Sequence, residues 1–174
     1  MTIDGKTYTV VSNGSATLNY SLNASTGKIT FSSTNSTSSN NIQITAADGQ
    51  ADNIIVDGAH IKLNTGDGAD TIEVVNAYHI TSGTGNDSIT ITGKVHNVGA
   101  SDGDDMIVIA QTATVGNTVA GNLNNDTIIN YGRVNYNIEG GYGNDLVENR
   151  GYIGNSITGH YDMDTLVNYG SVGG

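Results

Sequence analysis

The stretch Gly83-Thr84-Gly85-Asn86-Asp87-Ser88-Ile89-Thr90-Ile91 decides how this chain folds. A tight glycine turn ends in an aspartate and leads directly into alternating β-branched residues, the pattern of a turn followed by a strand with one buried face. The chain carries seven copies of this pattern, each marked by an aspartate at the same place. The seven aspartates are Asp52, Asp70, Asp87, Asp105, Asp126, Asp145 and Asp164.

The spacing of these aspartates predicts a solenoid. Successive aspartates are 18, 17, 18, 21, 19 and 19 residues apart, a period typical of stacked supersecondary repeats. Each repeat also contains a second, less regular turn and strand, as at residues 131–134, so that one repeat forms one full coil. Helix is not expected, because no stretch keeps a 3.6-residue apolar period. The predicted fold class is all-β, a parallel β-helix or β-roll solenoid of about 18–19 residues per coil.

Residues 1–46 lack the glycine-aspartate turn and are expected to form an N-terminal β-strand cap. They contain short alternating stretches, such as residues 16–22 and 28–31, separated by turn-forming Ser, Asn and Gly. A solenoid needs its end covered, because the last coil otherwise presents an unpaired strand edge. Residues 47–174 are then the solenoid itself. The alternative is a separate small β domain that precedes the repeats.

Two sets of side chains recur with a 19-residue step near the C-terminus. Asn130, Asn149 and Asn168 fall in register, which predicts a hydrogen-bonded asparagine ladder running from coil to coil. Tyr142 and Tyr161 occupy the same turn position one coil apart. This predicts an exposed aromatic pair that either contacts another subunit or a sugar, or simply stacks.

Composition excludes several classes of function. The 174 residues include 17 acidic and 6 basic side chains, a formal net charge of -11, which argues against nucleic acid and anionic membrane surfaces as partners. There is no Cys, and no apolar run approaches the roughly 18 residues of a membrane span. The opening residues lack the basic and apolar regions of a cleaved signal, so we expect either export by another route or a sequence cut from a longer chain. No H-E-x-x-H or G-x-S-x-G motif is present, and the chain is not expected to be an enzyme.

The aspartate column predicts a metal site. Stacked coils bring neighbouring carboxylates to inter-strand spacing, where they repel each other unless a cation lies between them. Ca²⁺ takes six to eight hard oxygen ligands, and glycine-rich turns expose carbonyl oxygens that complete such a shell. Thiolates and paired imidazoles are missing from these turns, which disfavours Zn²⁺. The candidate calcium ligands are the seven aspartates together with Asp48, Gly66, Gly68, Gly83, Gly85, Ser101, Gly103, Gly141 and Gly143.

Residues 47–174 also resemble the calcium-binding nonapeptide repeats, G-G-x-G-x-D-x-U-x, of the RTX (repeats-in-toxin) proteins. Residues 140–147 follow this pattern completely, whereas Asn122 and Asn124 replace both glycines before Asp126. His160 and Asp162 do so in the last copy, so calcium binding is in doubt at these two turns. Only one half of each coil carries the motif. The chain is therefore most similar to the one-sided, roughly 19-residue repeats of bacterial RTX adhesin ice-binding segments.

The resemblance implies calcium ions along one edge of the solenoid and a secreted or cell-surface protein, with type I secretion as the export route. The expected function is a calcium-binding structural module, such as an adhesin extender, a biofilm matrix component or a surface-layer building block, whose partners are calcium and other copies of itself, head-to-tail or lateral. Two alternatives remain. One is an ice-binding solenoid, which needs flat ranks of outward Thr and Asn that only Thr84 and Asn86 supply. The other is the carrier or secretion portion of an exoenzyme or toxin.

Overall fold

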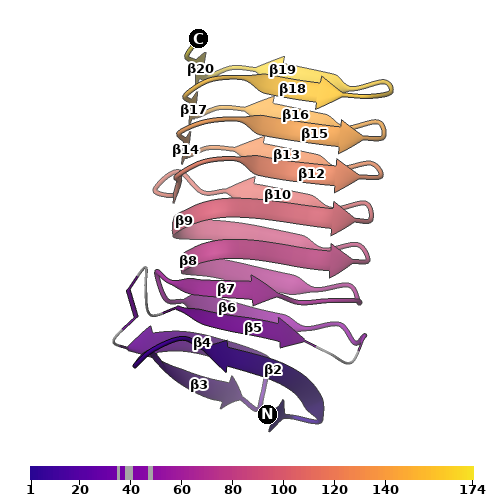
Figure 1. Ribbon diagram of the computed structural model, residues 1–174. Coiled ribbons are helices and arrows are strands. Elements are labelled where there is room, and N and C mark those ends of the chain that lie inside the picture. The colour runs from indigo at the N-terminus through magenta and orange to yellow at the C-terminus, as the bar shows by residue number, and fades with distance from the viewer. Residues whose placement is uncertain (35, 38–40, 47–48) are drawn as a thin grey trace.

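The chain winds into a β-solenoid whose coils stack into a rod, with the two termini at opposite ends (Figure 1). The computed structural model describes residues 1–34, 36–37, 41–46 and 49–174. About seven coils follow one another with a spacing of about 19 residues, as the sequence predicted. No helix that could cross a membrane is present in the described residues.

The solenoid body is built from short parallel strands. Each coil contributes one strand that follows the glycine-aspartate turn and one that precedes the next such turn, and in the later coils the two-residue strands β11, β14 and β17 lie between them. In β8 and β9 the two are joined without a break. The strands of the body are β6 (Asn53–Asp57), β7 (Ile61–Asn64), β8 (Thr71–Thr84), β9 (Ser88–Asp102), β10 (Met106–Ile109), β11 (Thr114–Val115), β12 (Val119–Leu123), β13 (Thr127–Asn130), β14 (Arg133–Val134), β15 (Ile138–Tyr142), β16 (Leu146–Asn149), β17 (Tyr152–Ile153), β18 (Ile157–His160), β19 (Thr165–Asn168) and β20 (Ser171–Val172).

The register between coils places like residues above like residues. Ile72 pairs with Ile89, which in turn pairs with Ile107. These side chains are at most 1% exposed, because alternate residues of a strand point to the same side and this side faces the interior. The interior is one continuous apolar cluster from the first strands to Ile153.

The N-terminal strands close the rod. They are β1 (Thr2–Ile3), β2 (Lys6–Ser12), β3 (Thr17–Asn23), β4 (Lys28–Thr34) and β5 (Ile42–Ala46). β2 pairs with β5 and β3 pairs with β4, both antiparallel. β4 and β5 pair in turn with β6 and β7, both parallel. The parallel ladder therefore begins at β4 and β5, inside the segment expected to be the cap, and the antiparallel hairpin strands β2 and β3 cover its end.

The predicted asparagine ladder forms inside the last coils. The side-chain amide of Asn130 donates to Asn149 Oδ1 at 2.8 Å, and the amide of Asn149 donates to Asn168 Oδ1 at the same distance. Asn130 stands directly above Ile109 in the register of the sheet. The apolar column therefore becomes a hydrogen-bonded polar column from the fifth repeat onward, and two of its three members are completely buried.

Candidate metal-binding edge

The glycine-aspartate turns all lie along one edge of the rod, on the right in Figure 1. Every glycine predicted as a calcium ligand has a positive φ, and so does Ser101 (φ 88°). Where glycine is replaced, Asn122, Asn124, His160 and Asp162 also take positive φ. The same left-handed turn is thus kept in each of these copies, despite the strain that a side chain adds there.

From the second turn onward, the position two residues before the aspartate separates the turns into two kinds. Its φ is 127° at Gly68, 120° at Gly85 and 136° at Gly103, a region that is essentially limited to glycine. At Asn124 and Asp162 the value falls to 75° and 76°, the ordinary left-handed region. The two turns that depart from the motif therefore have a different backbone conformation.

Glycine is required at this position by the coil beneath it. A Cβ on Gly85 would lie 2.1 Å from the carbonyl oxygen of Gly68, and a Cβ on Gly103 would lie 2.1 Å from that of Gly85. Carbonyl oxygens of successive turns therefore point at the next coil along this edge. They are hard oxygen donors of the kind that Ca²⁺ prefers.

The aspartates form a ladder of their own. The backbone N–H of each aspartate donates to Oδ1 of the aspartate one coil further on, and these distances lie between 2.7 and 3.0 Å from Asp52 to Asp164. The structure thus brings all seven predicted aspartates into one column. Asp48, the other predicted carboxylate ligand, lies outside the described residues.

The second carboxylate oxygen has no such partner. In six of these aspartates Oδ2 is buried and accepts no hydrogen bond in the described part of the chain. The six residues are Asp52, Asp70, Asp87, Asp105, Asp126 and Asp145. Leaving one buried charged oxygen unsatisfied is costly, and here the same omission recurs in six successive coils.

The Oδ2 atoms point into the turn. A Cβ on Gly121 would lie 2.1 Å from Oδ2 of Asp126, and one on Gly140 would lie 2.2 Å from Oδ2 of Asp145. In the second and third repeats the residue at this place, five before the aspartate, is a hydroxyl residue, and in the fourth it is Ala100. Thr65 donates to the Ser82 carbonyl at 2.7 Å, and Ser82 donates to the Ala100 carbonyl at 2.6 Å. A hydroxyl has one proton, so each of these two can donate either to that carbonyl or to the nearby carboxylate, whose pKa burial raises and such a bond helps to lower.

Burial changes the ionisation of the column. It raises the pKa of Asp70 from 3.8 to about 6, that of Asp105 to about 7 and that of Asp126 to about 8. Burial also raises the pKa of Asp87 and of Asp145. Repulsion from neighbouring carboxylates adds to the effect, for example from Asp105 on Asp126. Both effects disfavour the charged form, and a bound cation would relieve both.

These residues fit a hard divalent cation. They offer buried carboxylate oxygens without donors, and turn carbonyls on the same edge. Across the residues that the structure describes, no three His, Cys, Asp or Glu side chains gather closely enough to hold a metal alone. Carbonyl oxygens or water would therefore complete any shell, as calcium sites allow and structural zinc sites, closed by four side chains, do not.

The N-terminal end of the column is closed by the cap. Lys6 Nζ lies 3.0 Å from Oδ1 of Asp52, and the Tyr8 hydroxyl donates to the same oxygen at 2.7 Å. Sequence reasoning missed both residues, because 46 and 44 positions separate them from Asp52 and neither belongs to a repeat.

A second ladder of hydrogen bonds runs along the outer side of the turns. Its acceptors lie one coil before their donors, the reverse of the aspartate ladder. From Asp104 onward, the residue before each aspartate donates its backbone N–H to the equivalent side chain of the preceding coil. Asp104 donates to Asn86 at 3.0 Å, Asn125 to Asp104 at 2.9 Å and Asn144 to Asn125 at 2.8 Å. The recurrence of Asn or Asp at this place in four successive repeats was the available signal.

The predicted tyrosine pair is present on this edge. The rings of Tyr142 and Tyr161 stack with their centroids 4.3 Å apart and an interplanar angle of 7°. Both side chains are more than half exposed.

No protein-family model, curated protein or solved structure matches this chain.

Proposed function

We propose that this protein is a calcium-binding structural module, secreted or displayed on a bacterial cell surface, in which ions along the glycine-aspartate edge hold the coils together. The observation that carries the proposal is the column of six buried Oδ2 atoms without hydrogen-bond donors. A single buried oxygen without a hydrogen-bond donor would be a local defect. Six such oxygens in register, one in each of six successive coils, indicate a site that a cation occupies.

Calcium is favoured over other cations by the donor set. All the groups that converge on the edge are oxygens, and the turns bearing Gly at both inner positions also direct carbonyls toward the next coil. Mg²⁺ needs a near-ideal octahedral shell and gives up its water reluctantly, whereas Ca²⁺ accepts irregular shells of six to eight oxygens.

The structural role follows from the thinness of the core. Each coil contributes only a few inward side chains, while ordering its backbone costs about 1–2 kcal/mol per residue. In this protein the carboxylate column adds repulsion to that cost. Cations that bind the folded column but not the unfolded chain would contribute their binding free energy to folding.

No catalytic role is proposed. We expect the partners to be calcium and further copies of the chain. The carrier portion of an exoenzyme or toxin stays an alternative. An ice-binding face is not favoured, because the coils above Thr84 place Asp102, Leu123 and Tyr142 at its position in the register.

Circular dichroism during a calcium titration tests the proposal. The calcium-free chain should have a loosened or disordered spectrum and should regain its β spectrum with a midpoint on the order of 0.1–1 mM calcium. Magnesium at the same concentrations is the control and should restore little structure. An unchanged β spectrum after exhaustive chelation would sink the proposal.

A further inference from the structure

The edge opposite the glycine-aspartate turns carries an unusual share of the positive charge of this chain. Only six lysines and arginines oppose 17 acidic residues. Lys6, Lys28 and Arg150 each pair with a carboxylate. Within the described residues, Lys62, Lys94 and Arg133 pair with none. Lys62 and Lys94 both lie near this second edge, two coils apart, with the coil that carries Tyr78 between them.

Three of the four histidines lie beside these two lysines. We call the group formed by His60, Lys62, Tyr78, His79, Lys94 and His96 the basic edge. Lys62 stands beside His79 in the register of the sheet. Burial, with repulsion from Lys62 and His96, lowers the pKa of His79.

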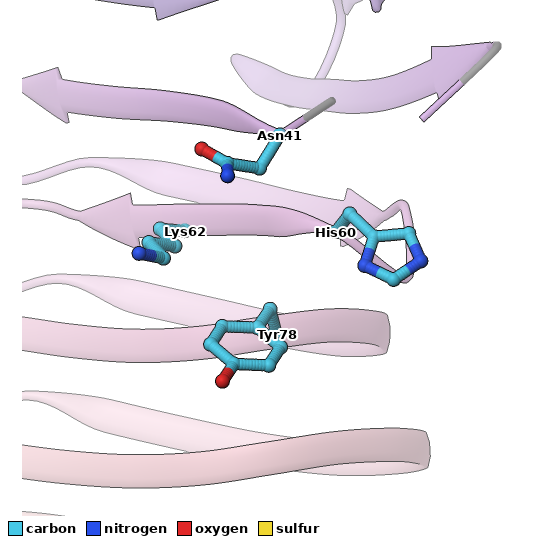
Figure 2. Close-up of a pocket in the computed structure, with 4 residues that line it drawn as sticks. All are labelled: Asn41, His60, Lys62 and Tyr78. Carbon is cyan, nitrogen blue, oxygen red and sulfur yellow. The ribbon is translucent and has the colours of Figure 1, made fainter. Parts of the chain in front are cut away.

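Tyr78 contacts both a lysine and a histidine of the basic edge. Lys62 Nζ lies 5.6 Å from the centroid of the Tyr78 ring. His96, one coil further on, stacks on the same ring with the centroids 5.0 Å apart. Figure 2 shows Asn41, Lys62 and Tyr78 on successive levels of the rod, with His60 beside them. The Asn41 amide oxygen accepts a hydrogen bond from Asn13 at 3.2 Å, so its N–H groups remain to face outward.

Hollows follow the basic edge across several coils. One of about 120 Å³ is lined by Asn41, His60, Lys62 and Tyr78. A second, of about 270 Å³, shares Tyr78 and continues past Lys94 and His96. Among the residues that the structure describes, no carboxylate lines either hollow. The nearby Asp57 accepts a hydrogen bond from Asn76 at 2.7 Å and stands two coils from Lys94 in the register.

The acidic edge does not cancel this local charge. Six residues of extended strand separate His96 from Asp102, roughly 20 Å at the rise of a strand. Charges in physiological salt are screened over about 8 Å. An anion at the basic edge therefore meets mainly the lysines and imidazoles there.

We propose that the basic edge binds a linear anionic polysaccharide, whose carboxylate or sulfate groups meet Lys62 and Lys94 while sugar hydroxyls meet the amides and imidazoles between them. The line of hollows suits a chain rather than a single ion. Two ammonium groups set among amides suit a polymer that carries widely spaced anionic groups and many hydroxyls. They suit a nucleic acid less well, because its phosphates follow one another closely. The Tyr78 ring is engaged by Lys62 and His96, so it offers no free face for base stacking of the kind single-stranded nucleic acids use.

The test is an NMR titration of the calcium-loaded protein with short dextran sulfate, and with neutral dextran of the same length as the matched probe. Dextran sulfate should shift the amide signals of residues 60–62, 78–79 and 94–96, and neutral dextran should not. Substituting both lysines, Lys62→Gln with Lys94→Gln, should weaken binding about tenfold, as expected for two exposed charge contacts. Lys28→Gln removes one charge on the other face and should leave the affinity within about twofold.

Each other result counts against the proposal. NMR shifts confined to the aspartate turns would show that calcium ions at the opposite edge bridge the protein and the dextran sulfate. Equal binding of inorganic sulfate would indicate a single-anion site, and equal binding of single-stranded DNA would indicate a general polyanion site. If the double variant does not fold, Lys94→Gln alone removes an exposed side chain, and unchanged affinity in that variant, together with shifts elsewhere, would overturn the assignment.

Discussion

The ammonium group of Lys6 lies 3.0 Å from Oδ1 of Asp52, and the carboxylate that it meets is completely buried. In every later coil this oxygen accepts the backbone N–H of the preceding aspartate. Asp52 has no preceding repeat, so the lysine and the Tyr8 hydroxyl take over that role from the cap. The cap therefore ends the carboxylate column electrostatically as well as covering its strand edge.

Replacing Lys6 should destabilise the protein. Lys6→Met keeps much of the aliphatic stem but leaves a buried carboxylate without its charged partner, and we expect a loss of about 1–3 kcal/mol in the free energy of unfolding. Urea denaturation in saturating calcium measures this. Lys28→Met is the matched control, because the pair between Lys28 and Glu73 is partly exposed and should be worth about 1 kcal/mol or less. Equal effects of the two substitutions would contradict the role of Lys6.

Aspartates in the middle of the column should matter more for calcium than the last one. Asp87→Asn keeps an oxygen that accepts the N–H of Asp70 but removes the charge, so the two inter-coil gaps beside it should bind calcium less well. Asp164→Asn should have a smaller effect, because its turn carries His160 and Asp162 in place of glycine. Calcium bound per chain, measured by equilibrium dialysis, gives the comparison. Equal losses in the two variants would refute this ranking.

Stability should depend on pH in opposite senses with and without calcium. The raised pKa values mean that the calcium-free folded state holds protons that the unfolded chain, with carboxyl pKa values near 3.8, has already lost. The stability contributed by these groups is thus fully present below about pH 4 and is lost as the pH rises through about 6, 7 and 8. Circular dichroism of the calcium-free protein should show more β structure at pH 5 than at pH 8.5.

Calcium must displace those same protons. The calcium concentration at half-saturation should therefore be lower at pH 8.5 than at pH 6, and calorimetry in buffers of different ionisation enthalpy should detect proton release at pH 6. A midpoint independent of pH over this range would mean that the buried aspartates are not the ligands.

The asparagine ladder should be intolerant of a single apolar substitution. Asn149→Val places in the column a residue type that earlier coils use, but it leaves the buried Asn130 amide and the Gly151 N–H without their acceptor. We expect a loss of about 2–3 kcal/mol in stability, measured by urea denaturation in saturating calcium. Asn168→Val at the exposed end of the ladder is the control and should cost less. The interpretation fails if Asn149→Val is neutral.

The repeating part of the fold could be predicted because each coil repeats the same local rules. Glycine at the left-handed positions of residues 83–85 sets the turn, and alternation in residues 88–91 sets the buried face. Since like residues stack on like residues, a correct reading of one coil fixes the register of its neighbours. This is why the columns of Ile72, Ile89 and Ile107 and of Asn130, Asn149 and Asn168 follow from spacing alone.

Contacts between segments without a shared period could not be predicted in this way. Lys6 pairs with Asp52, and β4 pairs with β6 in the parallel ladder. Tyr78 contacts both Lys62 and His96 on the edge opposite the turns. None of these pairs is marked by a repeat, because the cap and the second turns vary in length and composition.

The sequence by itself determined that the chain is a β-solenoid with glycine-aspartate turns on one edge and a column of aspartates. This follows because, when coils stack, residues that recur with a fixed period in the sequence come to lie in one column. Only the tertiary structure decided how each carboxylate is used. One oxygen, Oδ1, is taken by the neighbouring backbone, whereas Oδ2 is buried without a donor in six coils. The direction of a carboxylate depends on the coils above and below it, and that direction separates a stack of ordinary turns from a column of oxygens suited to a cation.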